Sequence, residues 1–166
     1  MGKVVSQDEL ILLRGEWKRN GRKIVFASGC FDLLHPGHVR LLEHARDLGD
    51  TLIVGVESDA SARARIAAEA GPVACNDRPL TSVEERMEIL AALASVDYVF
   101  EFDAREAKSA MARLQPDVIV EGGGETFQAT READTSTGTG TIIVRIALEP
   151  GHSTTRLIER IKQIPA

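Results

Sequence analysis

The sequence has few of the residues that mark extracellular, membrane-spanning or nucleic-acid-binding proteins. Its two cysteines, Cys30 and Cys75, lack C-x-x-C spacing, so they indicate neither a metal site nor a disulfide framework. No apolar run approaches the ~20 residues that span a bilayer, and the opening MGKVVSQDEL lacks the apolar core of a signal peptide. The net charge of -5 is not the basic excess of a general nucleic-acid binder. We therefore expect a cytoplasmic protein that binds neither nucleic acid nor membrane.

What the sequence does contain is an alternation of apolar strands and amphipathic helices over 166 residues, about the length of one domain. Apolar runs predict strands at about 23–28, 51–57, 96–101, 117–120 and 141–147. Helical periodicity predicts helices at 7–19, 36–48, 59–68, from Ser82, around 107–114 and at 153–163. This order predicts a single α/β domain over 1–166, with a Rossmann-like, doubly wound, parallel five-stranded sheet and helices on both faces. Residues 1–20 carry the N-terminal helix, and the polar segment 125–140 is expected to be a mobile loop.

The most informative stretch, GCFDLLHPGH, follows the first strand and enters the next helix. Gly29 allows a ligand to approach the backbone closely. His35 lies at the helix entrance and His38 in its first turn, so both can face the point where free N–H groups favour an anion. Two imidazole donors there can stabilise charge that develops on a phosphoryl oxygen, and neither needs to be a nucleophile.

Other polar residues are candidates for binding phosphate groups. Arg63, Arg65 and Arg78 flank the loop at 66–80, and guanidinium groups suit bidentate phosphate contacts, although each alone is also an ordinary surface charge. Ser153, Thr154 and Thr155 begin the last helix, either as a simple cap or as hydroxyl and N–H donors to a triphosphate.

H-P-G-H at residues 35–38 fits the H-x-G-H signature of cytidylyltransferase-type nucleotidylyltransferases, and the sequence resembles this superfamily over roughly residues 20–163. Within it, the chain is most similar to bacterial heptose 1-phosphate adenylyltransferases, which make ADP-heptose. The segments that carry this likeness are LIVGVESDASAR, EERMEILAALASVDYVFEFD, LQPDVIVEGG and PGHSTTRLIERI.

The resemblance implies a direct in-line displacement at the α-phosphorus of a nucleoside triphosphate, ATP or CTP, by a phosphorylated small-molecule acceptor. It implies Mg²⁺ bound mainly through the triphosphate, no metal site made by the protein, and a homodimer. His35 and His38 brace the α-phosphate on this hypothesis. The nucleotide contacts that it implies are Ser28, Gly29, Cys30, Phe31, Asp32, Gly37, Arg86, Gly122, Gly123, Ser153, Thr154 and Thr155. Asp32 can equally hold the turn, and Arg86 can equally be a solvated or salt-bridged arginine.

The chain departs from these relatives near the expected substrate. Their Lys-Gly-Gly-Asp after the fourth strand is Glu121-Gly122-Gly123-Gly124 here, and their lysine after the second helix is missing from ARARIAAEAGPVACND. A glutamate in place of lysine beside a phosphate costs several kcal/mol, roughly, unless another cation compensates or the side chain points elsewhere.

These departures leave three functions open. The first is an adenylyltransferase that acts on a sugar 1-phosphate, with heptose 1-phosphate as the first candidate. The second is a cytidylyltransferase that acts on glycerol phosphate or another alcohol phosphate, and the third is a nucleotide-binding regulatory protein without turnover. A dinucleotide-dependent oxidoreductase is disfavoured because no G-x-G-x-x-G follows the first strand.

Overall fold

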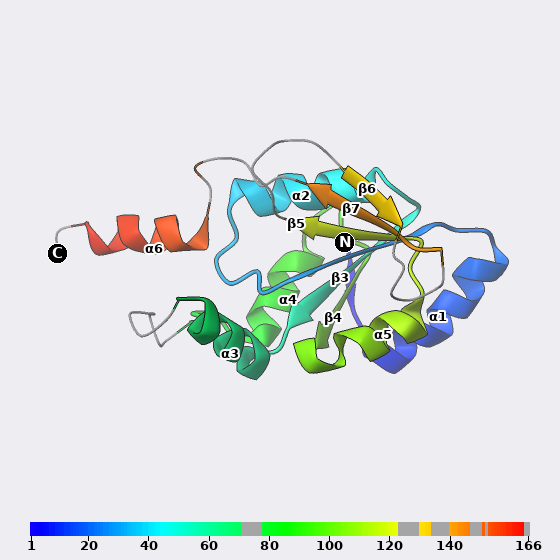
Figure 1. Cartoon of the computed structure of the whole chain (residues 1–166), viewed down its shortest axis with the longest axis horizontal. Coiled ribbons are helices and arrows are strands. Elements are labelled where there is room, and N and C mark those ends of the chain that lie inside the picture. The colour runs from blue at the N-terminus through cyan, green and yellow to red at the C-terminus, as the bar shows by residue number, and fades with distance from the viewer. Residues whose placement is uncertain (71–77, 123–129, 134–139, 147–150, 152, 165–166) are drawn as a thin grey trace.

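The computed structural model describes residues 1–70, 78–122, 130–133, 140–146, 151 and 153–164. Within these residues, seven strands form one sheet in the order β1-β4-β3-β2-β5-β7-β6 (Figure 1). The strands are β1 Lys3–Val4, β2 Ile24–Gly29, β3 Thr51–Glu57, β4 Tyr98–Phe102, β5 Val118–Gly122, β6 Thr130–Ala133 and β7 Ile142–Ile146. The paired strands run parallel apart from β6 and β7, which are antiparallel.

The structure confirms the Rossmann-like α/β fold and contains all five expected strands. It adds β1 and β6 as short strands at the two edges of the sheet. The expectation of a loop throughout 125–140 is wrong at Thr130–Ala133, because these residues pair with β7. The rest of that expected loop, apart from Gly140, lies outside the described residues.

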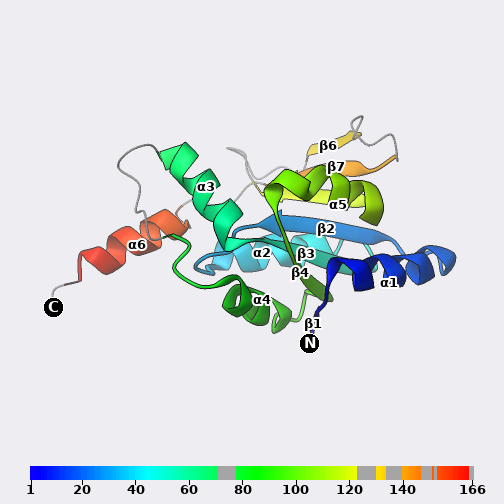
Figure 2. The same ribbon diagram turned by 90° about the horizontal axis from the view of Figure 1, so that it is seen from below.

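Six α-helices occur in the part of the chain that the structure describes, and four of them cover the sheet. The helices are α1 Gln7–Arg19, α2 Pro36–Arg46, α3 Asp59–Ala70, α4 Val83–Ala91, α5 Ala107–Leu114 and α6 Thr154–Lys162. Helices α2 and α4 lie on one face and α1 and α5 on the other, as the two views in Figures 1 and 2 show. The expected doubly wound arrangement is therefore present.

The hydrophobic core has two parts, one on each face of the sheet, and alternate residues of the central strands contribute to each part. Val25 and Ala27 of β2 pack in the cluster that contains the buried residues of α2 and α4. Ile24 and Phe26 pack in the opposite cluster with residues of α1 and α5. Because successive strand side chains point to opposite faces, one short apolar strand supplies both halves of the core.

The carboxyl ends of the parallel strands point toward α3 and α6 (Figure 1). Strand β2 lies between β3 and β5, so the winding of the sheet reverses beside it. Ligands of such sheets bind at the carboxyl edge near this reversal. No helix among the described residues is long and apolar enough to cross a bilayer.

Candidate active site

Two histidines stand together at the amino end of α2. His35 is the N-cap residue, with an extended backbone (φ -138°, ψ 165°), and Pro36 begins the helix. The rings of His35 and His38 are stacked, with centroids 3.8 Å apart and planes inclined by 19°. The sequence places them three residues apart, and the first helical turn brings both to the same side. The expected pair of imidazoles is therefore assembled.

The surroundings of His38 favour its uncharged form. Burial, with a smaller contribution from the positive charge of neighbouring His35, lowers the pKa of His38 from 6.5 to about 4. The free N–H groups of the helix terminus further disfavour an added positive charge. His38 Nδ1 is buried, and no hydrogen-bond partner occurs for it among the described residues. A neutral imidazole still carries one N–H that can donate to a phosphoryl oxygen.

The loop between β2 and α2 is held in an unusual conformation by Phe31. Its φ of 51° lies in the left-handed region, which a bulky side chain rarely adopts. The buried Phe31 ring meets the His38 ring edge-on, with centroids 5.3 Å apart. The ring also lies against Gly29, where a Cβ would approach it to 3.2 Å. The absence of a side chain at Gly29 leaves room for the Phe31 ring, and this ring in turn packs against the His38 ring and fixes its position.

Asp32 organises this loop from within the protein. Its Oδ1 accepts a hydrogen bond of 2.6 Å from the N–H of Leu80, and its Oδ2 accepts one of 2.9 Å from Nε of Arg78. Its backbone carbonyl accepts from the Thr81 hydroxyl at 2.9 Å. The sequence left open whether Asp32 contacts the nucleotide or holds the turn. These contacts show a structural role, in which Asp32 anchors the segment that carries Arg78.

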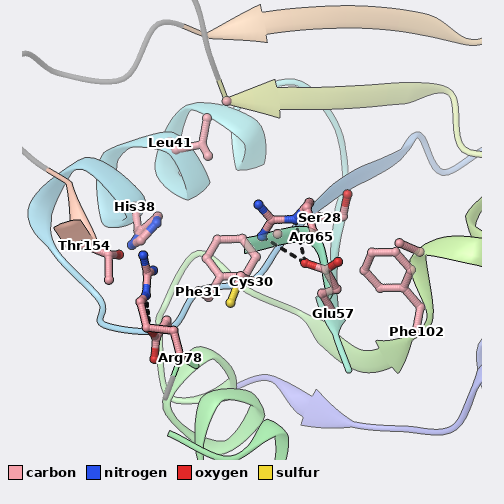
Figure 3. A pocket seen from close by; sticks show the side chains of 14 residues that line it. Ser28, Cys30, Phe31, His38, Leu41, Glu57, Arg65, Arg78, Phe102 and Thr154 are labelled. Carbon is pink, nitrogen blue, oxygen red and sulfur yellow. Dashed lines mark hydrogen bonds and ion pairs between the residues drawn. The ribbon is translucent and has the colours of Figure 1, made fainter. Parts of the chain in front are cut away.

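A cavity of about 530 Å³ opens at the carboxyl ends of the strands, beside His38. Ten of the predicted site residues line it: Ser28, Gly29, Cys30, Phe31, Asp32, His38, Arg65, Arg78, Gly122 and Thr154. Figure 3 shows His38, Thr154 and Arg78 on one side of the cavity, and Glu57 and Arg65 on the other. Segments from five different elements and loops thus meet at one place.

Glu57, at the end of β3, is a site residue that the sequence reasoning missed. Its side chain is buried, and its Oε2 forms an ion pair with Arg65 at 3.0 Å. Its Oε1 accepts from the hydroxyl of Ser61 at 2.9 Å. The sequence feature that could have identified Glu57 is a carboxylate at the end of a strand that is otherwise almost entirely apolar. Glu57 holds Arg65 at the cavity, while Arg63 on the same helix is exposed and does not line it.

Arg86 is fully buried and positions the loops around the cavity rather than facing it. Its guanidinium donates to the carbonyl oxygens of Cys30 at 2.5 Å, Glu57 at 2.9 Å and Thr81 at 3.2 Å. It also pairs with the carboxylate of Asp59. The salt-bridged role considered from the sequence is confirmed, with Asp59 as the partner of a buried rather than solvated side chain. Its contact with the nucleotide stays a prediction, and four of its N–H donors are already used within the protein.

The last helix contributes through its first residues. Ser153 caps α6 by accepting a hydrogen bond from the N–H of Arg156 at 3.2 Å. Thr154 lines the cavity, and its hydroxyl donates to the carbonyl oxygen of Leu33 at 3.4 Å. Thr155 is exposed. The capping role predicted for Ser153 is confirmed, and α6 lies beside the loop that carries the histidines.

Glu121 replaces the lysine that the relatives carry near the expected acceptor substrate, and an arginine lies beside it. Its Oε2 lies 3.1 Å from Nε of Arg145 on the neighbouring strand β7, and both side chains are exposed at the edge of the sheet. Gly122 lines the cavity, whereas Glu121 does not. Gly123 and Gly124 lie outside the described residues. Two of the alternatives are therefore present together, because an arginine pairs with Glu121 and the Glu121 side chain does not line the cavity.

Two further predicted residues, Gly37 and His35, are buried and do not line the cavity. Gly37 lies within α2, and His35 lies against His38. Burial raises the pKa of the Cys30 thiol, so this lining residue is a neutral one. Leu41, Phe102 and Ala104 complete the wall with apolar surface that the sequence analysis did not assign to the site.

Comparison with known proteins agrees with this geometry. Residues 26–160 match the family model described as cytidylyltransferase-like. The chain is 40% identical over 158 residues to the bifunctional protein HldE of Koribacter versatilis, an alignment that covers 95% of this chain and 31% of the relative. It is 45% identical over 144 residues to the same-named protein of Syntrophotalea carbinolica, covering 87% and 28%. The chain thus spans about a third of the length of these curated relatives.

Solved structures show the same fold. A lipopolysaccharide core biosynthesis protein from Thermoplasma volcanium superposes with a TM-score of 0.61 and 27% identity, over 78% of this chain and 99% of that protein. A pantoate-beta-alanine ligase from Francisella tularensis has a TM-score of 0.56 at 16% identity, over 100% and 74%, and supports the fold alone. From the match of the family model and the paired histidines at the head of α2, this chain belongs to the cytidylyltransferase-like family of nucleotidyltransferases.

Proposed function

We propose that this chain transfers AMP from ATP to a sugar 1-phosphate and releases pyrophosphate, with heptose 1-phosphate as the first candidate acceptor. The observation that carries the proposal is the stacked His35–His38 pair at a helix terminus, in which His38 is uncharged and lines the cavity. The similarity to the HldE proteins supports the choice of ATP and of heptose phosphate.

The chemistry is a single in-line displacement. An oxygen of the acceptor phosphate attacks the α-phosphorus of ATP, the bond from that phosphorus to the bridging oxygen breaks, and pyrophosphate leaves with the electron pair. The imidazole N–H of His38 and the backbone N–H of Gly37 donate to the α-phosphate oxygens as negative charge develops there. Because these donors are held in place beforehand, they need little reorganisation during the reaction.

Two arginines supply the charge that a net acidic protein otherwise lacks. Arg65 and Arg78 line the cavity on opposite sides, each held by a buried carboxylate, Glu57 and Asp32. Fixed guanidinium groups match the geometry of phosphate oxygens. We assign Arg65 and Arg78 to the phosphates of the substrates.

Magnesium enters this proposal through the triphosphate. Among the described residues, no group of three or more His, Cys, Asp or Glu side chains is placed to hold a metal ion. The two carboxylates that line the cavity, Asp32 and Glu57, already bind arginines. Magnesium supplies charge neutralisation of the phosphates when bound, and the side chains of the protein orient the reacting groups.

The competing candidate is a cytidylyltransferase that uses CTP and glycerol phosphate, favoured by the Glu121 departure described above. A matrix of ATP or CTP against heptose 1-phosphate or glycerol phosphate, read as pyrophosphate release, separates the two. We expect release with ATP and heptose 1-phosphate, and none from a His38→Ala control. Release only with CTP and glycerol phosphate contradicts the proposal. Triphosphate binding without product from any pair identifies a protein without turnover.

A further inference from the structure

A second cavity, of about 600 Å³, lies at the opposite end of the sheet from His38. Its walls include Ile24, Asp117 and Ile142, at the amino ends of strands β2, β5 and β7, together with the end of α1. In Figure 1 this is the end of the sheet away from α3 and α6. The active site occupies the carboxyl ends of β2 and β5, so the two cavities are separate.

The second cavity is basic, although the whole chain carries a net charge of -5. Arg14, Lys18, Arg22 and Lys23 line it, against one carboxylate, Asp117. Oδ2 of Asp117 accepts a hydrogen bond of 2.7 Å from the N–H of Ile24, which orients the carboxylate, and its single negative charge offsets only one of the four cations. Four cations around one cavity in an acidic protein attract a multiply charged anion.

The two arginines are fixed in place without losing their charge. Nε of Arg14 donates to the carbonyl oxygen of Leu114 at 2.7 Å, and its NH2 donates to Oε1 of Gln115 at 2.9 Å. NH2 of Arg22 donates to the carbonyl oxygen of Asp50 at 2.9 Å. These acceptors orient the guanidinium groups but bring no negative charge to offset them.

Helix capping explains only part of this cluster. Lys18 lies in the last turn of α1, where a cation interacts favourably with the helix dipole. Arg22 and Lys23 follow the helix, and the Asp50 carboxylate near them accepts a hydrogen bond of 2.7 Å from the backbone N–H of Lys23. Among the described residues, none of the four cations forms an ion pair with a carboxylate. The cluster therefore retains charge for a ligand.

We propose that this basic cleft is a second binding site, for a phosphorylated small molecule. Its volume is that of ordinary small-molecule pockets, which measure roughly 300–1,000 Å³. Lysine and arginine together bind phosphate groups through charge and through several N–H donors. Its concave shape suits a small ligand, which the four side chains can surround.

The two sites can be occupied together. Ile24 begins β2 in the basic cleft, and Gly29 ends the same strand at the active site. Five residues of extended strand separate them, which is about 16 Å. A ligand in the basic cleft therefore does not compete sterically with a triphosphate beside His38.

The experiment is a titration of the ¹⁵N-labelled full chain with inorganic pyrophosphate, followed by amide chemical shifts. We expect saturable shifts at Lys23, Ile24 and Gly21, in addition to any at the active site. The variant Lys18→Gln/Lys23→Gln should weaken binding at the cleft by about tenfold or more, since it removes two charged contacts. A matched pair of exposed lysines elsewhere, Lys3→Gln/Lys108→Gln, should leave binding at the cleft unchanged.

The ligand class is narrowed by comparing AMP with glucose 1-phosphate as probes. Tighter binding of AMP at the cleft assigns a nucleoside phosphate, and tighter binding of glucose 1-phosphate assigns a sugar phosphate. Shifts confined to residues around His38 would overturn the second site and leave the proposed transferase activity standing. Cleft shifts that weaken equally in both lysine variants would also overturn it, because general charge then accounts for them.

Discussion

At the scale of single residues, the site depends on charge states set by burial. Burial keeps His38 neutral, and the buried carboxylates of Glu57 and Asp32 hold the guanidinium groups of Arg65 and Arg78 in place. The same buried imidazole links the stability of the fold to pH.

We expect the His38 pKa to lie near 4 in the folded protein, so the free energy of unfolding should depend on pH between this value and about 6.5. Because the folded pKa is below the unfolded value of 6.5, the unfolded chain binds more protons between these pH values. The free energy of unfolding should therefore fall as pH drops from about 6.5 toward 4, and His38→Gln should remove that part of the decline. Denaturant unfolding of both proteins at several pH values measures it. Parallel pH profiles of the two proteins would contradict a depressed pKa.

The two arginines of α3 provide a matched pair. Arg65→Ala removes a cation held at the cavity by Glu57, so we expect KM for a phosphorylated substrate to rise about tenfold or more. Arg63→Ala removes an equal charge from the same helix at a position that does not line the cavity, and should change KM by less than about twofold. Steady-state kinetics of both variants test the assignment. Equal effects would show that only the overall charge of the helix matters.

Arg86 should be needed for folding more than for substrate contact. Arg86→Met leaves the carbonyl oxygens of Cys30 and Glu57 and the Asp59 carboxylate without their donor. We expect a loss of about 1–3 kcal/mol in the free energy of unfolding, because carbonyl oxygens inside the protein lose their donor, while the partly exposed Asp59 carboxylate stays hydrated. Urea denaturation measures this loss. Unchanged stability with weakened ATP binding would restore the nucleotide-contacting role.

At the scale of elements, the sequence predicts the strands that have an apolar run of their own. It does not predict the strands that form only by pairing with a distant segment. The strands at Ile24–Gly29 and Thr51–Glu57 are continuous apolar runs, and they were predicted. Strand β1 has two residues and becomes a strand only by pairing with Tyr98 and Val99 of β4. Strand β6 likewise depends on β7. Neither segment carries a period of its own.

The site shows the same division. His35 and His38 were found because one helical turn fixes their relation, and the helix was marked by Pro36. Glu57 was missed because its partner Arg65 lies eight residues away on the next helix, and its burial depends on the packed sheet. Arg86 carries no sequence signal of burial, because its acceptors are three backbone carbonyls and Asp59 from separate segments.

Helix α6 has the weakest anchorage of the elements at the site. None of its residues is buried, and Figures 1 and 2 show it extending from the end of the sheet. Its start therefore depends on the Ser153 cap, whose loss costs about 1 kcal/mol in other helices. We expect Ser153→Ala to raise amide hydrogen exchange in the first turn of α6 several-fold. The amides of β3 should be unaffected and serve as the internal control. Equal exchange with and without the cap would contradict this dependence.

At the scale of the whole molecule, the sheet separates two tasks. Its carboxyl edge carries the histidines and arginines of the proposed transfer, and its amino edge carries the basic cleft. The overall negative charge makes both sites local exceptions, so their phosphate binding should weaken as ionic strength rises. The homodimer implied by the family resemblance remains a prediction, which sedimentation equilibrium can test.

The role of the two imidazoles can be measured by single-turnover AMP transfer with the wild-type chain and the His35→Ala/His38→Ala variant, with ATP affinity determined in parallel. If the imidazoles act on the transferred phosphorus, the rate should fall by at least about 100-fold, while the Kd for ATP changes by less than about threefold. A variant that transfers AMP at near wild-type rate, or that loses ATP binding as much as it loses rate, would contradict the account.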